Sequence, residues 1–174
     1  MVLFVLSALA ALIVTPAPSR AETTVKDVLV AVRTLGFVAN PPVGPVDLAV
    51  VFDPAQPLSL TDMKTVRTVL NTGIVIGTAL VRPVPVPVTE LDRLTGFRFV
   101  LLTDGLGPHV HTIADMTRGL GVLTISTDLS CVRGGQCVMG VASEPRVQVL
   151  VNRAASDAAA VRFAVSFRMM ITEL

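Results

Sequence analysis

Aromatic residues are scarce in this sequence, which has no tryptophan, no tyrosine and 7 phenylalanines among 174 residues. Charged residues are also few, at 16% against 52% hydrophobic residues, and this balance excludes an intrinsically disordered chain. Lysine occurs only at Lys26 and Lys64, and the arginines are dispersed, so neither a polybasic membrane patch nor a nucleic-acid-binding surface is indicated. We therefore expect a folded domain whose partner is a protein or a small molecule.

The first 21 residues have the pattern of a secretory signal peptide. Residues 2–14 form an unbroken apolar or small-residue run, too short to cross a bilayer core of about 30 Å as a helix. Ser19 and Ala21 place small residues three and one positions before a cut ahead of Glu22. We expect export to the periplasm, with residues 22–174 as one domain that does not insert into the membrane. An uncleaved anchor is the alternative.

Apolar periodicity along the rest of the chain alternates between helix and strand. This alternation predicts an α/β fold: a single domain with a mostly parallel sheet, flanked by helices in Rossmann-like layering, and an antiparallel hairpin near the C-terminus. The three prolines in residues 79–88 predict an edge strand or an extended arm there. Helices are expected over residues 25–35, 59–70, 110–118 and 152–170, and further strands over residues 46–52, 97–103, 122–126, 137–141 and 146–151.

Asp53, Asp104 and Asp128 each stand at or just after the carboxyl end of a predicted strand. Open α/β sheets bind ligands at this edge, so the three aspartates are a candidate ligand edge, although aspartate is also a common turn and cap residue. His109 and His111 follow a proline at a predicted helix start, where their side chains diverge, which disfavours a metal site. No GxSxG motif or paired base is present, so we predict no catalytic residue, no metal and no cofactor.

Cys131 and Cys137 are the two cysteines of the chain, and they enclose the sequence VRGGQ. Two cysteines in an exported chain are more often bonded than free, so we expect a disulfide that fixes the turn at Gly134 and Gly135. A redox switch and two reduced thiols are the alternatives.

The predicted helix over residues 152–170 carries two apolar stripes. One stripe would cover the sheet, and the second consists of Phe163, Phe167 and Met170. The second stripe is expected to contact a partner protein or a second copy of the chain as a homodimer, or else a neighbouring helix of the same domain.

The C-terminal third contains VLTISTD, then RGGQC, then a strand, then RVQVLVNRAA leading into the last predicted helix. This order resembles the YfiR-like periplasmic regulators, and the likeness extends over most of residues 24–172. The resemblance implies a domain that binds and restrains an inner-membrane signalling protein, typically a diguanylate cyclase, and so links envelope signals to cyclic-di-GMP and biofilm control. The alternative is an exported small-molecule or metal-binding α/β domain with enzymatic activity that uses the strand-end aspartates.

Overall fold

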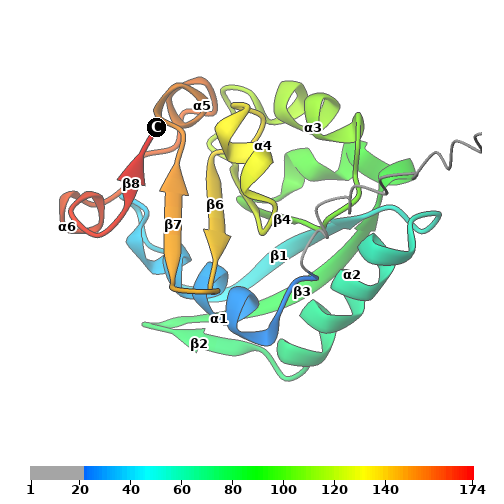
Figure 1. The fold of residues 1–174 in the computed structure, drawn as a ribbon. Helices are drawn as coiled ribbons and strands as arrows, with labels where there is room; N and C mark the ends of the chain where they lie inside the picture. Colours follow the sequence, from blue (N-terminus) through cyan, green and yellow to red (C-terminus); the bar gives the residue numbers. More distant parts are fainter. Residues whose placement is uncertain (1–21) are drawn as a thin grey trace, which may run out of the picture.

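Eight strands form one sheet in the computed structural model, which describes residues 22–174 (Figure 1). The expected signal peptide, residues 1–21, lies outside the described residues. Across the sheet the order is β2 (Ile74–Ile76), β3 (Ala79–Pro87), β1 (Gly44–Phe52), β4 (Phe99–Leu102), β5 (Leu123–Ser126), β6 (Met139–Ala142), β7 (Gln148–Val151) and β8 (Thr172–Glu173).

The predicted fold class is confirmed. Strands β3, β1, β4, β5 and β6 are parallel neighbours, β2 pairs antiparallel with β3, and β6 and β7 form the antiparallel hairpin expected near the C-terminus. No helix among residues 22–174 is long and apolar enough to cross a membrane. The helices are α1 (Val25–Thr34), α2 (Pro57–Val69), α3 (His109–Thr117), α4 (Leu129–Arg133), α5 (Arg153–Ala158) and α6 (Val165–Arg168), with 3-10 helices η1 (Leu35–Phe37) and η2 (Val88–Gly96).

The core lies on both faces of the sheet, because successive side chains of a strand point to opposite faces. In β1, Leu48 and Val50 belong to the cluster that includes α1 and α2, whereas Ala49 and Val51 belong to the cluster that includes η2, α3 and α4. All four side chains are at most 1% exposed. The continuous apolar run of β1 is therefore the pattern of a strand covered on both sides.

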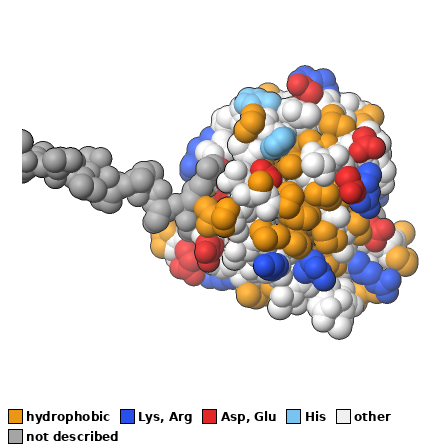
Figure 2. Space-filling model, turned by 90° about the vertical axis from the view of Figure 1, so that its right-hand side faces the viewer, with side chains coloured by type: hydrophobic (Ala, Val, Ile, Leu, Met, Phe, Trp, Pro, Cys, Tyr) orange, Lys and Arg blue, Asp and Glu red, His pale blue; other side chains and the backbone are white. Residues whose placement is uncertain are grey.

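The structure corrects the predicted position of the proline-rich strand. β3 is the second strand from the edge, but β2 pairs only with its first residues, so Pro83, Pro85 and Pro87 lie beyond that pairing. Alternate residues of a strand direct their N–H groups to the same side of the strand. Prolines at every second position therefore remove N–H donors only on the side away from β1, and the pairing of β3 with β1 stays intact. Figure 2 shows hydrophobic side chains gathered on the side of the molecule that carries α2 and β3.

The prediction of one long helix over residues 152–170 is wrong. Asn152 caps α5 as predicted, but α5 ends at Ala158, and Ala160 adopts a left-handed conformation with φ of 58°. The chain then runs extended beside the segment that follows α1: Ala39 N–H donates to Arg162 O at 2.8 Å and Ala164 N–H donates to Phe37 O at 2.8 Å. These long-range hydrogen bonds replace the helical ones that the alanine-rich sequence favours locally.

Candidate functional site

The carboxyl ends of β1 and β4 form the switch point of the sheet, the place at which open α/β folds bind ligands. The chain leaves β1 for α2 on one face and leaves β4 for α3 on the other face. Asp53 follows β1 directly, and Thr103 and Asp104 follow β4. The polar residues around these two strand ends are therefore the candidate site.

Two buried hydroxyl groups connect β1, α2 and β4 at the switch point. Thr103 Oγ1 donates to Val51 O at 2.9 Å, and Ser59 Oγ lies 2.6 Å from Thr103 Oγ1. Because the Thr103 proton is directed at Val51 O, Ser59 is the donor between the two hydroxyls, and Ser59 Oγ accepts the N–H of Asp53 at 2.7 Å. Both hydroxyl protons are thus held in structural hydrogen bonds.

Asp62, on α2, connects the N-terminal segment to the end of β4. Its side chain is 1% exposed, and its two carboxylate oxygens accept the N–H of Thr23 at 3.0 Å and the N–H of Asp104 at 2.9 Å. Thr23 Oγ1 also lies 2.8 Å from Thr127 Oγ1, just after β5. Thr23 therefore covers the part of this edge that lies between α2 and the end of β5.

Asp27 is a second buried carboxylate at this edge. Thr24 and Asp27 form the capping box of α1, and the other oxygen of Asp27 accepts the N–H of Ser143 at 2.7 Å, just after β6. Burial raises the pKa of Asp27, but the hydrogen bonds from Thr24 and Ser143 together outweigh it, so its pKa lies below the ordinary value of 3.8. Asp27 thus joins the start of α1 to β6 as a charged group.

Asp27→Asn is expected to lower the free energy of unfolding by about 1–2 kcal/mol at neutral pH, because a charged acceptor of several hydrogen bonds is lost. The depressed pKa means that this contribution is present above the unfolded-state pKa of about 3.9 and disappears as pH falls through the folded-state pKa. Urea unfolding from pH 7 to pH 2 should therefore show the wild-type and variant curves converging in acid. Asp115→Asn, an exposed carboxylate on α3, is the control; a gap independent of pH would contradict the assignment.

The three aspartates predicted as a ligand edge have separate local roles. The Asp53 side chain accepts the N–H of Ala55 at 2.9 Å in a turn, Asp104 is buried and donates its N–H to Asp62, and Asp128 caps α4 through Ser130 N–H at 2.9 Å. Within residues 22–174, no three histidine, cysteine or acidic side chains are grouped so that they could hold a metal ion. The structure brings Asp104 together with Asp62, which the strand-end pattern did not include.

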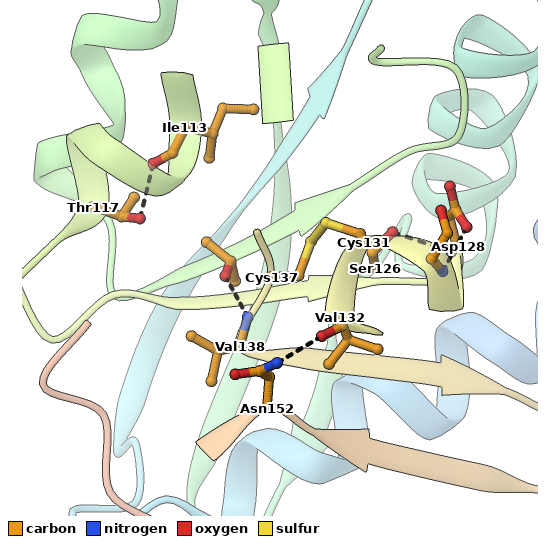
Figure 3. Close-up of a disulfide and its surroundings, with 11 residues drawn as sticks. Ile113, Thr117, Ser126, Asp128, Cys131, Val132, Cys137, Val138 and Asn152 are labelled. Carbon is orange, nitrogen blue, oxygen red and sulfur yellow. Dashed lines mark hydrogen bonds between the residues drawn. A yellow bond between two sulfur atoms is a disulfide. The ribbon is translucent and has the colours of Figure 1, made fainter. Parts of the chain in front are cut away.

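Cys131 and Cys137 form the predicted disulfide, with their Cα atoms 5.3 Å apart (Figure 3). The bond joins α4 to Cys137, two residues before β6, and both cysteines are buried. The neighbouring Val138 N–H donates to Thr124 Oγ1 and Asn152 Nδ2 donates to Val132 O, each at 3.0 Å.

A cavity of about 160 Å³ beside the disulfide is lined in part by Thr103, Ser126, Gly105, Leu106, Cys131 and Gln136.

The stripe predicted from Phe163, Phe167 and Met170 does not exist as one surface. Phe167 is 3% exposed and stacks on Phe37, with ring centroids 4.8 Å apart, and Phe163 packs beside it. Met170 alone of the three is largely exposed. The partner contact assigned to Phe167 is therefore wrong, and the alternative of a neighbouring helix of the same domain is confirmed, because α6 packs on η1 inside the domain.

No family model and no curated protein matches this chain. The fold is similar to that of the ABC domain in complex with L-Trp from Streptococcus pneumonia, with a TM-score of 0.59 and 8% identity over 86% of this chain and 60% of that one. A conserved domain protein from Vibrio cholerae o1 biovar eltor str. n16961 is also similar, with a TM-score of 0.61 and 8% identity over 88% of this chain and 61% of that one.

These likenesses show the fold alone. The chain spans about three fifths of the length of each of the two proteins.

The sequence pattern missed Asp27, Asp62 and Thr23 as functional or positioning residues. Asp27 had a detectable signal, because Thr24 followed three residues later by an acidic residue is a capping pattern. Asp62 had none: it lies within a helix, and its two partners are 39 and 42 residues away along the chain.

Proposed function

We propose that this chain is an exported, periplasmic regulatory domain that binds and restrains an inner-membrane signalling protein. A diguanylate cyclase is the proposed partner, so that the domain would link envelope signals to cyclic-di-GMP and biofilm formation. The order of motifs from Leu123 to Ala155, which resembles the YfiR-like regulators, supports this class of partner.

One structural observation favours regulation by binding over small-molecule chemistry: the polar side chains at the switch point are bonded to one another and to Thr23. Thr23 lies between Asp62 and Thr127, and the hydroxyl protons of Ser59 and Thr103 are held in structural hydrogen bonds. In an α/β enzyme the same position would present these groups to a substrate. These groups are therefore already engaged in structural hydrogen bonds, which supports recognition of a partner through the surface of the domain.

The buried disulfide supports the proposed compartment. Disulfides form and persist in oxidising environments such as the periplasm and are rare in the cytosol. The bond joins α4 to the segment that leads into β6, and α4 and β6 also contact each other at Gly140, where an added Cβ would lie 2.5 Å from Val132 Cγ1. The disulfide therefore holds together a close contact in the core.

Deleting the gene in the bacterium that encodes it is expected to raise cyclic-di-GMP and biofilm mass, because a restrained cyclase would be released. Mass spectrometry of nucleotide extracts measures the first effect and surface staining the second. Expression of the full chain from a plasmid should restore both values. In parallel, chemical cross-linking in intact cells should join the domain to a membrane protein with a diguanylate cyclase domain.

An unchanged cyclic-di-GMP level together with no cross-linked cyclase would contradict the proposal. A rise in melting temperature when calcium or magnesium is added to the purified domain would instead favour the alternative of a metal-binding domain, because a ligand that binds only the folded state stabilises it.

A further inference from the structure

A groove of about 460 Å³ runs along the edge of the sheet that is formed by β7 and β8, at the left of Figure 1. It lies on the opposite side of the domain from the proline-rich strand β3. Its lining comes from the end of α4, the start of β7 and the C-terminal residues: Arg133, Arg146, Val147, Gln148, Val149, Leu150, Met170, Thr172 and Leu174.

The sheet is incompletely paired at this edge. β8 has two residues, which pair with Leu150 and Val151 of β7. Gln148 and Val149, which precede them in β7, have no strand partner on that side among the described residues, and β8 has none on its outer side. An edge of this kind presents backbone N–H and C=O groups to which an extended segment can add as a further strand.

Large apolar side chains surround the unpaired edge. Val147 is 51% exposed, Met170 62% and Leu174 47%, and the three side chains line the same groove. Val165 and Met169 of the adjoining α6 segment are also exposed. Five large exposed apolar side chains at one corner of the domain are typical of a protein contact surface, since most exposed apolar residues of a monomer are scattered.

The charged side chains that line the groove are all positive. Arg133 and Arg146 are exposed, neither forms an ion pair with another described residue, and no acidic side chain lines the groove. Two other arginines of the C-terminal region, Arg162 and Arg168, do pair, with Asp157 and Glu173. The groove therefore presents uncompensated positive charge beside apolar side chains and an open strand edge.

We propose that this groove binds an extended, acidic segment of a partner protein, with apolar residues at alternate positions, which adds to the sheet beside β7 and β8. Its backbone would pair with the unpaired strand edge, its apolar side chains would contact Val147, Met170 and Leu174, and its carboxylates would pair with Arg133 and Arg146. This inference rests on the proposed function, because it names the surface through which the domain holds its membrane partner.

Binding of a synthetic probe tests the groove directly. The probe is a peptide of about ten residues that alternates glutamate and valine, long enough to cross the groove at about 3.3 Å per residue. It is expected to bind the wild-type domain with an affinity that falls as salt is added. Reversing both charges, Arg133→Glu with Arg146→Glu, should weaken binding at least about tenfold, because complementary charges become like charges.

The matched control reverses two exposed arginines elsewhere, Arg67→Glu with Arg82→Glu on α2 and β3, and should bind the probe nearly as the wild type does, after allowance for the change in net charge. Lack of binding to the wild type, equal binding to the groove variant, or equal binding of a lysine–valine peptide would overturn the inference. Melting curves of both variants confirm that they are folded.

Complementation of the deletion strain distinguishes a failure of this inference from a failure of the function on which it rests. If the groove variant fails to restore low cyclic-di-GMP in the deletion strain while the control restores it, both stand. If both variants restore it, the regulatory function stands and the groove is not the contact surface. If deletion itself has no effect, the proposed function fails, and peptide binding then reports on the groove alone.

Discussion

Replacing Phe167 with glutamate is expected to cost the domain about 5 kcal/mol or more of folding free energy. Phe167 is 3% exposed, and its ring lies within 8° of parallel to that of Phe37. Removing a buried phenylalanine side chain costs about 3–5 kcal/mol, and a carboxylate in its place adds the cost of an uncompensated buried charge. For a domain of this size the melting temperature should fall by at least about 10 °C.

Circular dichroism during thermal melting measures this effect. Met170→Glu is the matched control, because Met170 is three residues away and 62% exposed, and a surface substitution changes stability by only about 0.5 kcal/mol. Equal melting temperatures for the two variants would mean that Phe167 does not lie in the core. A folded Phe167→Glu variant that failed only to bind a partner would restore the contact role predicted from the sequence.

Replacing Asp62 with alanine is expected to cost about 3–5 kcal/mol. Asp62 is almost fully buried, and the change removes the acceptor of two N–H groups, those of Thr23 and Asp104. Hydrogen bonds to a charged group contribute about 1.5–3 kcal/mol each, and a buried donor that loses its acceptor carries a desolvation cost. Asp62→Asn keeps one carbonyl acceptor and should cost less than Asp62→Ala.

Amide hydrogen exchange distinguishes the specific effect from general destabilisation. In Asp62→Ala, the N–H of Thr23 should exchange much faster than the amides of the central strands, because only the N-terminal segment loses its attachment to α2. Asp92→Ala, an exposed aspartate in η2, is the control for removing a carboxylate. Uniformly faster exchange throughout the domain would show that Asp62 supports the core and not the N-terminal segment in particular.

Much of the fold between residues 25 and 151 follows from local patterns. The apolar period of residues 25–35 predicts α1, and Pro45 and Pro54 bound the apolar run that forms β1. The alternation of such segments is enough to predict the parallel sheet, because parallel strands need a connection across one face. The five-residue helix α4 was missed, because a segment this short has no detectable apolar period.

The candidate site could be predicted only in part. The strand-end positions of Asp53, Asp104 and Asp128 follow from the ends of predicted strands, and the topology places them at one edge of the sheet. Their hydrogen-bond partners do not follow, because a hydrogen bond such as that between Asp62 and Thr23 depends on how α2 and the N-terminal segment pack. The disulfide followed from the count of the cysteines together with the predicted export of the chain.

The amino-acid sequence determined the fold class, the order of the longer elements between residues 25 and 151 and the cysteine pairing of this protein, since each depends on residues close together in the chain or on the number of candidates. Tertiary contacts determined the conformation of residues 159–174. Their alanines and apolar spacing favour one long helix, but Ala160 turns the chain and residues 162–164 pair with residues 37–39. Packing against Phe37 stabilises Phe167 inside the domain, and such long-range contacts outweigh the small differences in local helix propensity.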